Sequence, residues 1–88
     1  MQAAEINSKV REAIQVTMGK KVNLNDSDSF IANLGFNSLK MVSLSLALEE
    51  KFGRPLLLNE WISQCEDPRL LTVHSLCNYV GKVVQRDN

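Results

Sequence analysis

Two segments of this 88-residue chain place apolar side chains at steps of three and four residues, the spacing of one face of an α-helix. The first runs from Ala3 to Met18 and stops before Gly19, a residue type that often ends helices. The second follows Thr72, a good N-cap residue, and its apolar positions are Val73, Leu76, Cys77, Val80 and Val84. Both segments are therefore predicted to be amphipathic helices.

The middle segment, Ser38 to Phe52, gives two conflicting signals. Apolar and other residues alternate from position 42 to 48, which is typical of a strand. Its residues are nevertheless mostly Leu, Ala, Met, Glu and Lys, which favour helices, and Gly53 and Pro55 follow where a helix would end. The composition favours a helix.

On a helical wheel, the apolar residues of this segment form two lobes. One lobe contains Met41, Leu44, Leu48 and Phe52, and the other contains Leu39, Val42 and Leu46. Two lobes exceed what packing against one core requires, so one of them is expected to face a partner. The alternative, that both lobes are core in a small bundle, stays open at this point.

The remaining segments connect these helices. Between Gly19 and Asn37 lies a polar connection whose apolar residues are expected to pin it to the core, namely Val22, Leu24, Phe30, Ile31 and Leu34. A short helix is expected at 56–62, around Trp61. The chain is thus predicted to be all-α, a small bundle of three principal helices plus one short helix in a single domain, 1–88.

Composition excludes several classes of function. Lys plus Arg and Asp plus Glu both number 10, so a basic face for nucleic acid is not expected. Apolar runs are too short for a membrane span, and the lack of a signal segment favours a cytoplasmic protein. Cys65, His74 and Cys77 lack a usual zinc spacing, so no metal is expected and Cys77 is interpreted as a buried thiol.

No catalytic residue is predicted either. His74 is the single histidine and is expected on a helix surface, and no serine stands in a known nucleophile motif. A pocket of several hundred cubic ångströms is not expected in so small a core.

The stretch from Leu34 to Leu39 places Gly35 three residues before Ser38, at the start of the middle helix. The simpler interpretation makes Ser38 an N-cap. The alternative is that a phosphate joined to its hydroxyl lies at a helix N-terminus, which favours anions. No base lies close in sequence to activate Ser38, so another enzyme would have to add the group.

Two stretches around Ser38 resemble the sequence pattern of a known family. Residues 30–42 read FIANLGFNSLKMV, and residues 46–53 read LALEEKFG. This pattern resembles the core of acyl and peptidyl carrier proteins. The resemblance implies an acyl-carrier-like bundle, with 4′-phosphopantetheine attached to Ser38 by a phosphopantetheinyl transferase and acyl or aminoacyl groups carried as thioesters. It also implies a non-catalytic protein that meets acyl- or aminoacyl-loading and processing enzymes.

Departures from the family pattern indicate which kind of pathway the carrier serves. Asn33 and Asn37 stand where many members have Asp, and the second helix, which is acidic in fatty-acid carriers, has acid only at Glu49 and Glu50. These departures favour a polyketide, nonribosomal-peptide or specialised fatty-acid pathway. The residues expected to bind partners are Leu39, Val42, Leu46, Asn37, Lys40 and Glu49.

The start at Met1 and the polar end at residues 86–88 favour a free-standing carrier. A monomer is also expected. The alternative is an unmodified helical protein–protein interaction domain that binds a partner helix through Leu39, Val42 and Leu46.

Overall fold

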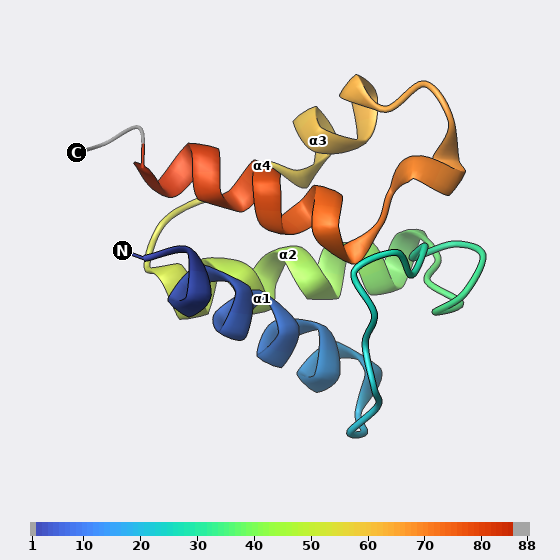
Figure 1. Cartoon of the computed structure of the whole chain (residues 1–88), viewed down its shortest axis with the longest axis horizontal. Helices are drawn as coiled ribbons and strands as arrows, with labels where there is room; N and C mark the ends of the chain where they lie inside the picture. The colour runs from blue at the N-terminus through green and yellow to red at the C-terminus, as the bar shows by residue number, and fades with distance from the viewer. Residues whose placement is uncertain (1, 86–88) are drawn as a thin grey trace.

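The computed structural model describes residues 2–85, which form a helical bundle without strands (Figure 1). Its helices are α1 (Ala3–Met18), α2 (Ser38–Phe52), α3 (Leu58–Gln64) and α4 (Val73–Gln85), with a 3-10 turn, η1 (Pro68–Leu70), before α4. The predicted all-α class is confirmed, as is the arrangement of three long helices and one short helix. Met1 and residues 86–88, from which a free-standing chain was predicted, lie outside the described residues.

Helices α1 and α4 bury the faces that their periodicity predicts. In α1 the buried residues are Ile6, Val10, Ala13 and Ile14. Gly19 ends this helix with a φ of 73°, and its N–H donates to the carbonyls of Gln15 and Val16. Helix α4 begins after Thr72, whose Oγ1 accepts from the Ser75 N–H at 3.1 Å, the N-cap bond predicted for it. Helix α1 packs against both α2 and α4.

Only one of the two apolar lobes of α2 belongs to the core. Met41, Leu44 and Leu48 are buried, and Phe52 packs partly buried beside them. The other lobe is open to solvent: the exposed fractions are 74% for Leu39, 58% for Val42 and 62% for Leu46. The alternative in which both lobes are core is therefore wrong, because the bundle covers one side of α2 only.

The long connection 19–37 is tied to the start of α4. Phe30 is fully buried and its N–H donates to the Leu71 carbonyl at 2.9 Å, while Ser29 and Thr72 form an isolated antiparallel bridge. Leu24 and Leu34 pack partly buried against the core, as expected. Ile31 does not, because it lies in the turn that follows Phe30 and is 47% exposed.

Phe36 provides the core contact that was expected of Ile31. Its ring meets the Phe30 ring edge-on, with centroids 5.1 Å apart, and its N–H donates to the Phe30 carbonyl at 2.8 Å. Gly35 makes this return possible with a φ of 68°, a conformation that side chains with a Cβ rarely adopt.

Trp61 anchors the short helix α3. It is 2% exposed, its ring meets Phe30 edge-on at 5.6 Å, and its Nε1–H donates to Ser75 Oγ at 2.8 Å. The Tyr79 hydroxyl also donates to the Leu57 carbonyl at 2.9 Å. The segment from Leu56 to Leu71 thus packs against α4 through Trp61.

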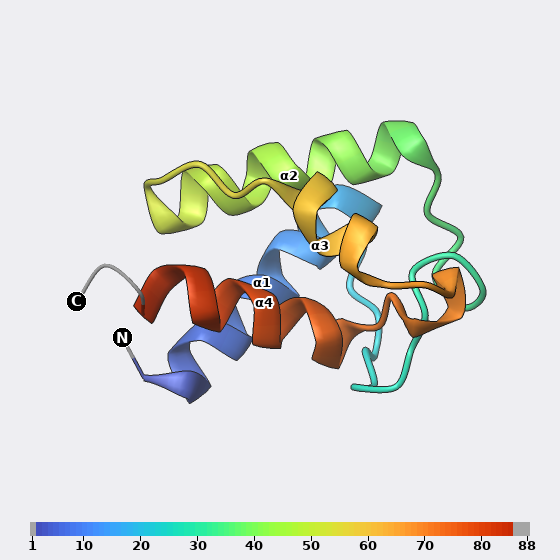
Figure 2. The same ribbon diagram turned by 90° about the horizontal axis from the view of Figure 1, so that it is seen from above.

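Helix α2 begins at the end of the molecule that also holds the 19–37 loop and η1 (Figures 1 and 2). The first turn of α1 and the last turn of α4 lie at the opposite end. Residues of α2 and α3 line one pocket, so α3 and the segment before it are the neighbours of α2 on this side.

Candidate functional site

Asn37 caps α2. Its backbone is extended, with a φ of −122°, and its Oδ1 accepts a hydrogen bond from the Lys40 N–H at 2.9 Å. The interpretation of Ser38 as the N-cap is therefore wrong, since Ser38 is the first residue of the helix itself. Asn is as good an N-cap residue as Ser, so the sequence carried a signal for either position.

The Ser38 hydroxyl is consequently not needed to cap the helix. The residue is exposed, and its side chain makes no hydrogen bond with any other residue in 2–85. It stands at the N-terminal end of a 15-residue helix, where the helix dipole and the unpaired N–H groups stabilise negative charge. The position suits a hydroxyl that becomes a phosphodiester.

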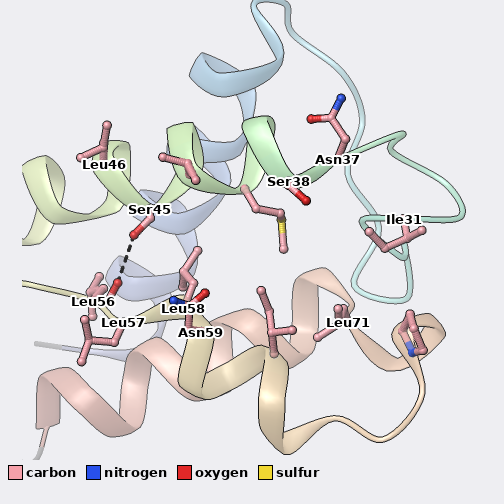
Figure 3. Close-up of a pocket in the computed structure, with 14 residues that line it drawn as sticks. Ile31, Asn37, Ser38, Ser45, Leu46, Leu56, Leu57, Leu58, Asn59 and Leu71 are labelled. Carbon is pink, nitrogen blue, oxygen red and sulfur yellow. Dashed lines mark hydrogen bonds between the residues drawn. The ribbon is translucent and has the colours of Figure 1, made fainter.

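A groove of about 520 Å³ begins at Ser38. Figure 3 shows α2 along one side and the 56–59 segment along the other, with Leu46 and Leu57 at the far end. The expectation that no such pocket exists is wrong. The reason is that the space lies between α2 and α3 at the surface, so it removes little from the core.

The lining of the groove carries no charge. It consists of Ile31, Asn37, Ser38, Met41, Val42, Ser45, Leu46, Leu56, Leu57, Leu58, Asn59, Ile62, Pro68 and Leu71. One of its few polar groups is already engaged, because Ser45 Oγ donates to the Leu56 carbonyl at 3.2 Å. Such a surface suits an apolar, uncharged chain, because an unpaired charge moved into it would lose its hydration.

The structure brings together some of the predicted partner residues and separates others. Val42, Leu46 and Asn37 line the groove with Ser38, whereas Leu39, Lys40 and Glu49 lie outside its lining. Glu49 is half-buried in the last turns of α2, away from Ser38.

Two exposed apolar residues of the groove were not predicted as site residues. Ile31 comes from the 19–37 loop and Leu57 from the residue before α3. Leu57 lies far from Ser38 in sequence, and the apolar character of Ile31 predicted a core position instead, so only the tertiary structure places both in the groove.

No second reactive centre is found in the described part of the chain. Within residues 2–85 there is no group of three His, Cys, Asp or Glu side chains that could hold a metal ion. His74 is exposed and contacts the Asn78 amide at 3.2 Å. Cys77 is buried, and burial raises the pKa of its thiol, which confirms the interpretation of this cysteine as a core residue.

None of the helices in residues 2–85 combines the length and the apolar content needed to cross a bilayer.

Comparison with known families decides the assignment. A family model described as a phosphopantetheine attachment site matches residues 4–67, which include α1, α2 and α3. The chain belongs to this family. It is accordingly a carrier protein that bears covalently attached 4′-phosphopantetheine, as the resemblance to acyl and peptidyl carrier proteins implied.

Carrier domains of this family are non-catalytic and interact with phosphopantetheinyl transferases and with further partner enzymes. Neither a curated protein nor a solved structure matches the chain. The family match also argues against the alternative of an unmodified interaction domain.

Proposed function

We propose that Ser38 carries the phosphopantetheine arm. The observation that supports this proposal is the division of roles at the start of α2, where Asn37 caps the helix and leaves the exposed Ser38 hydroxyl without a hydrogen-bond partner in residues 2–85. A phosphodiester there would gain from the helix N-terminus. Since none of the described residues that line the groove with Ser38 is a base, the transferase would supply the catalytic groups.

The groove beside Ser38 suggests what the arm carries. A chain on the arm's terminal thiol can fold back into the space between α2 and α3, where Val42, Leu46 and Leu58 offer apolar contacts. Each methylene that leaves water in this way contributes up to about 0.8 kcal/mol. An aminoacyl group would bring an ammonium into a lining without a carboxylate, so the groove favours an uncharged acyl chain as the sheltered cargo.

The remaining expectations stay predictions. They are a single domain over residues 1–88, a free-standing monomer in the cytoplasm, and service in a polyketide, nonribosomal-peptide or specialised fatty-acid pathway. The groove's preference for uncharged chains makes the nonribosomal-peptide pathway the least favoured of the three.

Intact-protein mass spectrometry tests the attachment site. The protein is incubated with coenzyme A and a broad-specificity phosphopantetheinyl transferase, beside the variants Ser38→Ala and Ser43→Ala. Ser43 is an exposed serine of the same helix and serves as the matched control. We expect one phosphopantetheine on the wild type and on Ser43→Ala, and none on Ser38→Ala.

Modification that persists in folded Ser38→Ala would place the arm elsewhere. A folded wild type that several transferases leave unmodified would contradict the carrier function of this chain.

A further inference from the structure

The end of the loop before α2 and the first three turns of α2 carry almost no charge. Between Asp28 and Glu49 the only charged residue is Lys40. Its ammonium group makes no ion pair or hydrogen bond within residues 2–85, whereas Lys51, the other lysine of α2, pairs with Glu12 at 3.0 Å. The groove lining adds no charge of either sign. One positive charge therefore stands on the α2 side of the groove, while on the opposite side Glu60 follows the lining residue Asn59, and Asp67 and Arg69, which pair with each other, flank Pro68.

Exposed apolar side chains lie on both sides of the groove. Leu39, Val42 and Leu46 are exposed at helical spacing on α2, and Leu57 is exposed on the other side of the groove. We call these four residues the docking face. Exposed leucines that occur singly are ordinary, but a contiguous apolar patch on a small protein marks an interaction site.

Any enzyme that acts on the arm has to cover this face. Because the arm starts at Ser38, an enzyme that receives it must approach the first turns of α2, where Leu39 and Val42 lie. This step depends on the proposed attachment at Ser38. Burying the docking face then supplies affinity that depends little on salt, since apolar contacts are not screened by ions.

The position of Lys40 sets the sign of the charge that such an enzyme can present. A basic patch on the enzyme would meet Lys40 close to Ser38 and would find no carboxylate on α2 before Glu49 and Glu50. Like charges brought together in this way are unfavourable and select against the wrong partner.

We propose that the enzymes that load and use this carrier present an apolar surface with a carboxylate opposite Lys40. The occupant of the docking face is thus an enzyme whose carrier-binding site is neutral or acidic, rather than one with a basic patch.

Two phosphopantetheinyl transferases serve as probes, one with a basic carrier-binding surface and one with an apolar surface that includes a carboxylate. The kcat/KM for the apo-protein is measured with each, in salt from about 0.01 to 1 M, over which the screening length falls from roughly 30 to 3 Å. We expect the apolar enzyme to be at least about tenfold better, a difference of about 1.4 kcal/mol, with only a small dependence on salt.

Three variants test the docking face, a control surface and the charge at Lys40. Val42→Asp is expected to lower kcat/KM with the apolar enzyme by about tenfold or more, because an apolar side chain is no longer buried and a negative charge is added near the enzyme's carboxylate. Val16→Asp is the matched control, because Val16 is an exposed valine of α1, 67% accessible, outside the groove lining. Lys40→Glu should weaken the apolar enzyme and improve the basic one. Circular dichroism checks that each variant is folded.

Failure of this inference differs from failure of the proposed attachment. If neither enzyme modifies the folded wild type, Ser38 is not an attachment site. If both modify it but the basic enzyme is better, or Val42→Asp behaves like Val16→Asp, the attachment stands and the docking inference is overturned. Self-association of the wild type that Val42→Asp abolishes would instead assign the docking face to a second copy, which also overturns the inference.

Discussion

Asn37 caps the helix whose first residue is Ser38: the Asn37 Oδ1 accepts from the Lys40 N–H at 2.9 Å, and the adjacent hydroxyl takes no part in the cap. Asn37 thus stabilises the helix end, and Ser38 keeps a hydroxyl that is available for modification. A hydroxyl that also closed the helix would lose its capping bond on modification, whereas Ser38 can be modified while the cap stays intact.

This division predicts different effects of alanine at the two positions. Asn37→Ala should destabilise the protein by about 1 kcal/mol, since the Lys40 N–H loses its acceptor, while Asn37→Asp retains the cap. Ser38→Ala should change the free energy of unfolding by less than about 0.5 kcal/mol. Urea denaturation followed by circular dichroism measures all three. A larger loss for Ser38→Ala than for Asn37→Ala would contradict the observed cap.

Filling the groove should expose the carried chain. An octanoyl group loaded on the wild type is expected to raise the free energy of unfolding by about 1–3 kcal/mol, at up to roughly 0.8 kcal/mol for each sheltered methylene. Asn59→Phe places a ring in the lining and should abolish most of this gain.

The control for this experiment is Glu60→Phe, which adds the same ring to the next residue of α3, outside the lining. Denaturation of the unloaded and octanoyl-loaded forms gives the gain for each variant. Equal gains in wild type and Asn59→Phe would show that the chain does not enter the groove.

Trp61 is expected to hold α3 in place and so to maintain one wall of the groove. Ser75→Ala leaves the buried indole N–H without its acceptor and should cost about 1–3 kcal/mol. Trp61→Ala should cost about 3–5 kcal/mol, whereas Trp61→Phe keeps a ring against Phe30 and should cost less. Chemical denaturation provides the values, and a Trp61→Ala protein as stable as wild type would remove Trp61 from this role.

The two cysteines should differ in reactivity and in their effect at alkaline pH. Burial raises the pKa of the Cys77 thiol, so the folded protein should react with iodoacetamide at Cys65 well before Cys77. Because the folded pKa is the higher one, the thiol's contribution to stability is complete below the ordinary thiol value of about 8.5 and is lost as the pH rises toward the folded value.

Peptide mass spectrometry after alkylation of the native protein ranks the two sites. Cys77→Ala should make stability less dependent on pH above that ordinary value. Faster labelling at Cys77 than at Cys65 in the folded state would contradict its burial.

Local patterns were sufficient for most of the fold. The bounds of α1 follow from apolar periodicity and from Gly19, because a helix requires a buried stripe and often ends at a residue that tolerates a positive φ. Those of α2 follow from its helix-favouring composition and from Gly53. The family pattern around Ser38 is equally local. The cap was assigned to the wrong residue because Asn37 and Ser38 have nearly equal capping preference, and only backbone geometry separates them.

The sequence by itself determined the all-α class, the helix that Ser38 begins and the two apolar lobes of α2, since each depends on residues within a few turns of one another. The tertiary structure decided which lobe is buried, that Phe36 rather than Ile31 enters the core, and that Leu57 lies across the groove from the Leu46 end of α2 (Figure 3). These depend on where Trp61 and Phe30 bring distant segments together, and that long-range packing has no signature in local spacing.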